Sequence, residues 1–183
     1  MSATADKESG HPRAEGERAR GVRRKVCVVV GIGNPLMGDD GFGIEMAKAL
    51  RRFNLGRRVL VLERQTMDFS ILDSAKGASK LVIVDAVKSG RPPGSVVKFI
   101  VGRAPSPVLR VPLSHEVNLG DIFALARKSG IHPPLTVVVG VEPADSTAGK
   151  GLSVEVKEAL PRALKEVRDE VKAYLEKGNG APS

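Results

Sequence analysis

Short, continuously apolar runs alternate with segments of helical periodicity along most of the chain, and this alternation constrains the fold more than any other feature of the sequence. Several runs lack the polar residue at every second position that a half-exposed strand would have. This is typical of strands buried on both faces of a parallel sheet. The predicted strands are Val26–Val30, Val59–Leu62, Leu81–Val84, Val96–Val101 and Leu135–Val141. We therefore predict an α/β fold with a mostly parallel, doubly wound sheet of about five strands.

Segments with helical spacing occupy the connections between most of these strands. The predicted helices are Gly41–Phe53, Asp68–Lys76, approximately Glu116–Lys128, and Ser153–Glu176. Because crossovers in a doubly wound sheet lie on both of its faces, they predict a three-layer arrangement. Pro161 falls inside the last helix and is predicted to kink or break it, because proline removes a backbone hydrogen bond.

One connection is too short to hold a crossover helix. The turn cluster Gly90–Gly94 lies between Leu81–Val84 and Val96–Val101. A parallel connection needs about a dozen residues or more. The strand Val96–Val101 is therefore predicted to run antiparallel to its neighbour.

The chain has 183 residues, enough for one domain with a full core. Residues 1–24 are polar and charged and are predicted to form a disordered tail, residues 25–177 a single α/β domain, and residues 178–183 a flexible tail. The chain has no run of about 18 apolar residues, and its N-terminus does not resemble a secretory signal. We expect a cytoplasmic protein without a membrane partner.

The composition argues against two classes of site. The net charge of +8 raises the possibility of a nucleic-acid partner, but aromatic residues make up 3% of the chain and tryptophan is absent, so base-stacking surfaces are not expected. Cys27 is the single cysteine, which excludes an internal disulfide and a multi-cysteine zinc site; we expect it to be a buried, unreactive core residue. Scarce glutamine and asparagine, with abundant charged residues, resemble the composition of a heat-adapted protein.

A glycine-rich loop, Gly31–Gly43, joins the first strand to the first helix. Phosphate-binding loops at such junctions are poor in acids, whereas this loop contains Asp39 and Asp40. The dinucleotide fingerprint fails at Leu36, where it needs glycine, and no Gly-Lys-Ser/Thr sequence occurs in the chain. The loop therefore favours a cation or a proton over a phosphate.

Other polar residues are predicted to lie at the same edge of the sheet, beyond the carboxyl ends of the strands. Asp85 follows the third strand directly, and His115 follows a long irregular segment. With Asp39 or Asp40 they could form a metal site or an acid–base site. Simpler interpretations also exist: Asp39 or Asp40 caps the next helix, Asp85 forms a turn, and His115 is an ordinary first-turn residue.

Four segments of the chain form an ordered set of motifs. The first is the glycine-rich loop, with Asn34, Asp39 and Asp40. The others are Leu81–Ala86 with the following glycine–proline turn, Ser114-His115 with Leu119 and Asp121, and Val139–Pro143 with Gly151–Ser153. Together they span residues 26 to about 170, and in this order they resemble the motifs of the nickel–iron hydrogenase maturation endopeptidases. Four motifs in register are a specific match.

The resemblance implies an enzyme that removes a short C-terminal extension from the hydrogenase large subunit after nickel insertion. It implies that Asp40, Asp85 and His115 contact nickel supplied by the substrate, and that Asp40 or Asp85 has a catalytic, aspartyl-protease-like role. The implied partner is the large-subunit precursor. Asp39 would be the structural acid of the motif, together with Gly33, Asn34 and Gly41.

One segment departs from the family pattern. After the second strand the family usually has an acid and two glycines before a threonine, whereas this chain has Glu63-Arg64-Gln65-Thr66. A bulkier, more positive loop there bears on the identity of the substrate. Three other functions are compatible with parts of the sequence: a non-catalytic, nickel-dependent assembly chaperone, a peptidyl-tRNA hydrolase, which has a similar Gly-Asn-Pro sequence, and an α/β enzyme that acts on a small molecule. The second requires a histidine soon after that motif, and none occurs between His11 and His115.

Overall fold

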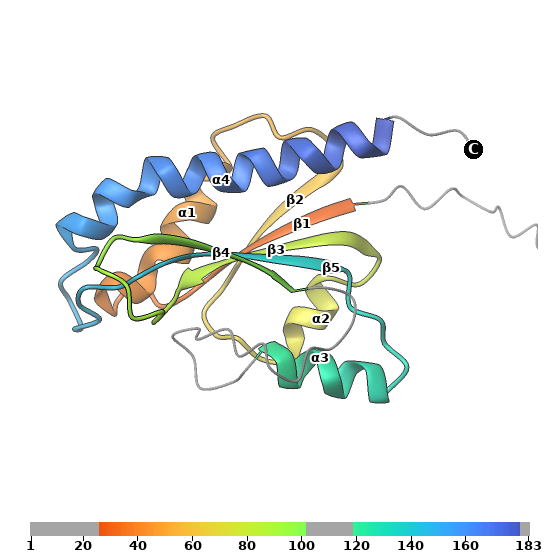
Figure 1. The fold of residues 1–183 in the computed structure, drawn as a ribbon, viewed down its shortest axis with the longest axis horizontal. Helices are drawn as coiled ribbons and strands as arrows, with labels where there is room; N and C mark the ends of the chain where they lie inside the picture. Colours follow the sequence, from red (N-terminus) through yellow and green to blue (C-terminus); the bar gives the residue numbers. More distant parts are fainter. Residues whose placement is uncertain (1–25, 102–118, 180–183) are drawn as a thin grey trace, which may run out of the picture.

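A five-stranded sheet forms the centre of the protein. The computed structural model describes residues 26–101 and 119–179, and in it the strands follow the order β2-β1-β3-β5-β4 (Figure 1). Their bounds are β1 Val26–Ile32, β2 Val59–Arg64, β3 Ala78–Ala86, β4 Val96–Val101 and β5 Leu135–Val141. All five predicted strands are present, and β1, β2 and β3 are longer than predicted.

The sheet is parallel except at one edge. β1 pairs in parallel with β2 and β3, and β3 pairs in parallel with β5. β4 pairs antiparallel with β5, so that Val96 lies opposite Val141. The predicted reversal of this strand is confirmed, and the short turn between β3 and β4 explains it.

Helices cover both faces of the sheet, as predicted (Figure 1). One face carries α1 and α4, and the other carries α2 and α3. Their bounds are α1 Phe42–Leu50, α2 Ser70–Ser74, α3 Leu119–Lys128 and α4 Val154–Asn179, and a short 3-10 helix, η1 Gly38–Gly41, precedes α1.

Alternate residues of the central strands feed two separate apolar cores. In β1, Val28 and Val30 pack on the α2–α3 side, while Cys27 and Val29 pack on the α1–α4 side. This double burial is the reason that the central strands are continuously apolar. Burial also raises the pKa of the Cys27 thiol to about 12, with opposing, smaller effects from the charges of Lys80 and Glu170.

The prediction that Pro161 breaks the last helix is wrong. α4 continues from Val154 to Asn179 with Pro161 inside it. Pro161 is exposed, so water can bind the carbonyl that loses its partner, while Val156, Ala159 and Ala163 hold the buried face of the helix against the sheet. The helix also ends three residues beyond the predicted Glu176.

A network of charges fixes α4 over the sheet. The Lys80 ammonium on β3 lies 2.5 Å from a carboxylate oxygen of Glu170 on α4, and both side chains are largely buried. Lys98 on β4 reaches Glu170 at 3.3 Å and Glu166 at 3.1 Å.

No helix within residues 26–101 and 119–179 has the length and apolar character needed to cross a membrane.

Candidate active site

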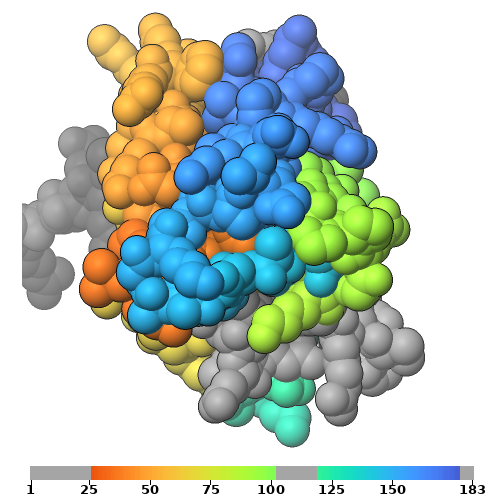
Figure 2. All heavy atoms as spheres, turned by 90° about the vertical axis from the view of Figure 1, so that its left-hand side faces the viewer, coloured from red at the N-terminus to blue at the C-terminus, as the bar shows by residue number. Residues whose placement is uncertain are grey.

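The segments that follow β1, β3 and β5 meet at the carboxyl edge of the sheet. Figure 2 shows this face, with the β1 loop in orange beside the blue segment after β5 and the green segment after β3. The N–H of Gly149 donates to the carbonyl of Leu36 at 2.9 Å, and the N–H of Val87 donates to the carbonyl of Val141 at 2.8 Å. These bonds tie three chain segments into one surface.

The glycines of the β1 loop are required by close backbone packing. Gly33 has φ +140°, and a side chain there would overlap the backbone of Asp40. A side chain at Gly41 would press on the backbone of Pro35, 2.9 Å away, and one at Gly43 would overlap the carbonyl oxygens of Ile32 in β1 and Val84 in β3. The loop is therefore folded against itself, and the start of α1 lies directly over the sheet.

Asp39 is buried and bonds to the segment after β5. One of its carboxylate oxygens accepts hydrogen bonds from the N–H groups of Ala144 at 2.8 Å and Asp145 at 2.9 Å. The other accepts from the N–H of Ser153 at 2.7 Å, just before α4. The carboxylate thus joins three backbone donors more than 100 residues away.

Asp40 lies beside Asp39 and is partly exposed. Its carboxylate accepts a hydrogen bond from the N–H of Asn34 at 2.8 Å, and its own N–H donates to the carbonyl of Met37 at 3.1 Å. The helix-cap interpretation of these acids is wrong, because neither η1 nor α1 has a side-chain cap in the described chain. Both carboxylates bind loop backbone instead.

Asp85 lies inside β3, which continues to Ala86, so the interpretation of Asp85 as a turn former is also wrong. It pairs with Gly140 of β5 and is fully buried. Ile83 packs on the face of the sheet that α2 and α3 cover. Because side chains alternate along a strand, the Asp85 side chain lies on the same face. η1, which contains Asp40, packs against the same strand.

The third residue of the predicted metal set, His115, lies outside the described residues. Within the described ranges, no group of three or more histidine, cysteine, aspartate or glutamate side chains is placed to hold a metal ion. Asp40 and Asp85 lie at one edge of the sheet, because η1 packs against β3. The joint role of Asp40, Asp85 and His115 stays a prediction.

Glu142 is a buried acid to which the sequence assigned no role. Its carboxylate accepts hydrogen bonds from the N–H of Ser89 at 2.7 Å, the hydroxyl of Ser89 at 2.6 Å and the N–H of Arg91 at 3.3 Å. Burial alone would raise the pKa of Glu142, but together these hydrogen bonds lower it. Glu142 thus fixes the turn that follows Asp85, and the Val139–Pro143 motif was the only sequence signal for it.

Residues 63–66, at the end of β2 and just beyond it, depart from the family pattern, and two of their charges make contacts within the protein. The Glu63 carboxylate pairs with Arg51 at the end of α1. The guanidinium of Arg64 donates to the Ser74 hydroxyl at 2.7 Å, and the Arg64 carbonyl accepts from Gly33 at 3.0 Å. The segment therefore borders the β1 loop, with Gln65 and Thr66 exposed beside it.

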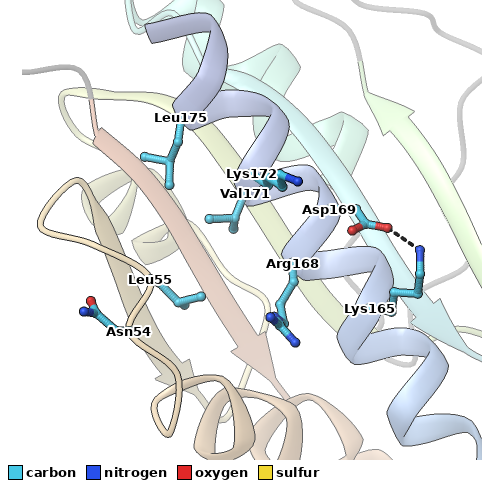
Figure 3. A pocket seen from close by; sticks show the side chains of 8 residues that line it. All are labelled: Asn54, Leu55, Lys165, Arg168, Asp169, Val171, Lys172 and Leu175. Carbon is cyan, nitrogen blue, oxygen red and sulfur yellow. Dashed lines mark hydrogen bonds and ion pairs between the residues drawn. The ribbon is translucent and has the colours of Figure 1, made fainter. Parts of the chain in front are cut away.

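A separate hollow of about 330 Å³ lies between the second half of α4 and the chain leading into β2 (Figure 3). Leu55 and Val171 form apolar parts of its wall, and Arg168, whose guanidinium stacks 4.3 Å from the centre of the Phe53 ring, forms a basic part. None of the predicted site residues lines this hollow.

Comparisons with known proteins identify the family. The HycI family, described as hydrogenase maturation protease, matches residues 44–170, more than half of the chain. Among curated proteins, the hydrogenase expression/formation protein HupD of Thiocapsa roseopersicina is 31% identical over 140 residues, which cover 75% of this chain and 63% of HupD. The hydrogenase 2 maturation protease of Escherichia coli K12 is 28% identical over 142 residues, which cover 76% of this chain and 87% of that protein.

A solved structure supports the same relationship. The hydrogenase maturating endopeptidase HybD of E. coli superimposes with a TM-score of 0.71 at 25% sequence identity, covering 81% of this chain and 93% of HybD. The resemblance found in the four sequence motifs and the predicted fold are both confirmed. On the matched family, the sequence relatives and the shared fold, this chain belongs to the hydrogenase maturation protease family.

Proposed function

We propose that the protein is an endopeptidase that removes the C-terminal extension of a nickel–iron hydrogenase large subunit after nickel insertion. Membership of the protease family supports the reaction class. The observation that carries the proposal is that two carboxylates, Asp40 and Asp85, come from separate segments of the chain to one edge of the sheet. Such an edge is where α/β proteins bind their ligands.

Nickel enters the proposal as part of the substrate. Asp40, Asp85 and His115 offer two carboxylates and an imidazole, a donor set that suits a borderline divalent ion. Three protein ligands leave coordination positions for groups of the precursor. Recognition through the bound ion would make cleavage depend on prior nickel insertion.

The chemistry assigned to the enzyme is hydrolysis of one peptide bond. A water molecule attacks the scissile carbonyl carbon, and one of the two carboxylates accepts the proton that the water releases. The carbon–nitrogen bond then breaks, and the proton passes to the leaving amine. Asp39 and Glu142 hold the backbone around this centre, which should keep the reacting groups in place.

The test compares cleavage of nickel-loaded precursor by the wild type and by Asp40→Asn, Asp85→Asn and His115→Ala. We expect each substitution to reduce the cleavage rate by on the order of 10²-fold or more. Asp73→Asn, which changes an exposed acid on α2, is the control and should leave the rate unchanged.

Two results would contradict the proposal. Full activity in all three variants would reject the assigned residues. A wild-type protein that binds the precursor and leaves the extension intact would favour the chaperone function over the protease. Circular dichroism of each variant shows whether a lost rate reflects a lost fold.

A further inference from the structure

The tip of the β1 loop presents an apolar side chain to solvent next to the candidate active site. Leu36 is 73% exposed, and the neighbouring Met37 is 38% exposed. Single exposed apolar residues are common on protein surfaces and need no special explanation. Leu36 differs in two ways. Hydrogen bonds hold its backbone in place, and Asn34, which forms one of these bonds, also contacts the candidate catalytic acid Asp40.

Hydrogen bonds on both sides hold the backbone of the tip. The N–H of Leu36 donates to the side-chain oxygen of Asn34 at 3.0 Å, and the N–H of Met37 donates to the Asn34 carbonyl at 3.0 Å. The carbonyl of Leu36 accepts from the N–H of Gly149 at 2.9 Å. With these bonds in place, the loop cannot turn the Leu36 side chain inward without breaking them.

The same residues connect the tip to the candidate catalytic acid. Asn34, which binds the backbone of Leu36 and Met37, also donates its N–H to the Asp40 carboxylate at 2.8 Å. The Met37 carbonyl accepts from the N–H of Asp40 at 3.1 Å. The exposed leucine and the carboxylate are therefore held in one rigid turn.

We propose that Leu36, with Met37 beside it, is a specificity-determining contact that binds an apolar side chain of the protein substrate close to the cleaved bond. The inference rests on the proposed function. The partner must be apolar there, because neither side chain offers a charge or a strong hydrogen-bonding group. A tip that is already ordered loses little conformational entropy on binding. Covering one leucine side chain corresponds to about 10- to 100-fold in affinity.

The experiment measures steady-state cleavage of the nickel-loaded, full-length precursor by Leu36→Ser and Leu36→Met. For Leu36→Ser we expect KM to rise at least about tenfold with kcat within about twofold of wild type, because the contact contributes to binding and not to the reacting groups. Leu36→Met keeps an apolar side chain and should stay close to wild type.

Ile100→Ser is the matched control. Ile100 is 65% exposed and lies on β4 opposite Val137, toward the other edge of the sheet. This substitution removes a similar exposed apolar side chain away from the candidate site, so both kinetic constants should be unchanged. The three substitutions fall at two exposed positions, Leu36 and Ile100, and circular dichroism checks that the fold is retained.

An unchanged KM in Leu36→Ser, an equal effect of Ile100→Ser, or a fall in kcat alone would overturn the inference. If the wild type binds the precursor but does not cleave it, the proposed function fails. The Leu36 contact is then tested by calorimetric affinities for the precursor, in which Leu36→Ser must weaken binding by at least about tenfold. If the wild type neither binds nor cleaves the precursor, both proposals are overturned.

Discussion

Replacing Asp39 by alanine should destabilise the protein strongly, because it removes one acceptor from three backbone donors. The N–H groups of Ala144, Asp145 and Ser153 lie 2.7–2.9 Å from the Asp39 carboxylate, which is fully buried. Each buried donor left without an acceptor costs about 1–3 kcal/mol. Water can reach the exposed Ala144, so values near the lower limit apply, and the sum is about 3–5 kcal/mol.

Asp39→Asn should cost less, about 1–3 kcal/mol. The asparagine keeps one oxygen, which can serve the two donors at Ala144 and Asp145. Its amide group would then face the N–H of Ser153, where two donors oppose each other. The order of stability is therefore predicted to be wild type, Asp39→Asn, Asp39→Ala.

Urea unfolding followed by circular dichroism measures this order. With a denaturant slope of about 2 kcal/mol per molar, Asp39→Ala should move the midpoint down by roughly 2 M. Asp145→Ala is the control, because it removes a half-buried carboxylate from the same segment. Within the described residues, this carboxylate accepts hydrogen bonds from the N–H of Thr147 and the ammonium of Lys150. A shift below about 0.5 M in Asp39→Ala, or an equal shift in the control, would refute the reasoning.

Three further predictions concern other parts of the fold. The pKa of Glu142 lies below its ordinary value of 4.5, so the stability that its carboxylate contributes should be complete above pH 4.5 and lost as the pH falls further. Glu142→Gln should therefore be less stable than wild type near neutral pH and should lose less stability on acidification. Thermal melts from about pH 7 to pH 3 measure both effects. Gly43→Ala should cost more than about 4 kcal/mol because a methyl group there overlaps the Ile32 and Val84 carbonyls, whereas Gly130→Ala, in open space at φ +76°, should cost about 1–2 kcal/mol; equal midpoints in urea would contradict this. Cys27 should resist a thiol reagent at about pH 8 in the native protein and react once the protein is unfolded in urea; rapid labelling of the folded protein would show that the thiol is accessible.

The strands were predictable because their signal is local. Val26–Val30 and Leu81–Val84 are apolar at every position, and the structure buries them on both sides between two layers of helices. The reversed strand Val96–Val101 followed from the length of the turn before it, which leaves no room for a crossover helix.

The contacts of the acids were not predictable, because their partners are distant in sequence. Asp39 binds N–H groups 105, 106 and 114 residues away, and Glu142 binds Ser89, 53 residues away. A single sequence places both acids near turns and gives no measure of which backbone donors face them. Helix capping by Asp39 or Asp40 was the default expectation from local preference, and these long-range contacts replaced it.

The error at Pro161 has a similar cause. Local preference predicts a kink or break at this residue, but apolar side chains on both sides of it pack against the sheet and keep the helix continuous. The end of β3 was also set by tertiary pairing: the partner strand β5 extends the ladder through Asp85 and Ala86. Asp85 is therefore a fixed, buried strand residue and not part of a mobile turn.

The most direct test of the proposed function is the intact mass of a nickel–iron hydrogenase large-subunit precursor after incubation with the wild-type protein, with and without nickel in the precursor. We predict that the nickel-loaded precursor loses the mass of its C-terminal extension and that the nickel-free precursor does not. Unchanged mass of the loaded precursor, or equal cleavage of both forms, would contradict the proposal that this protein is a nickel-dependent processing endopeptidase.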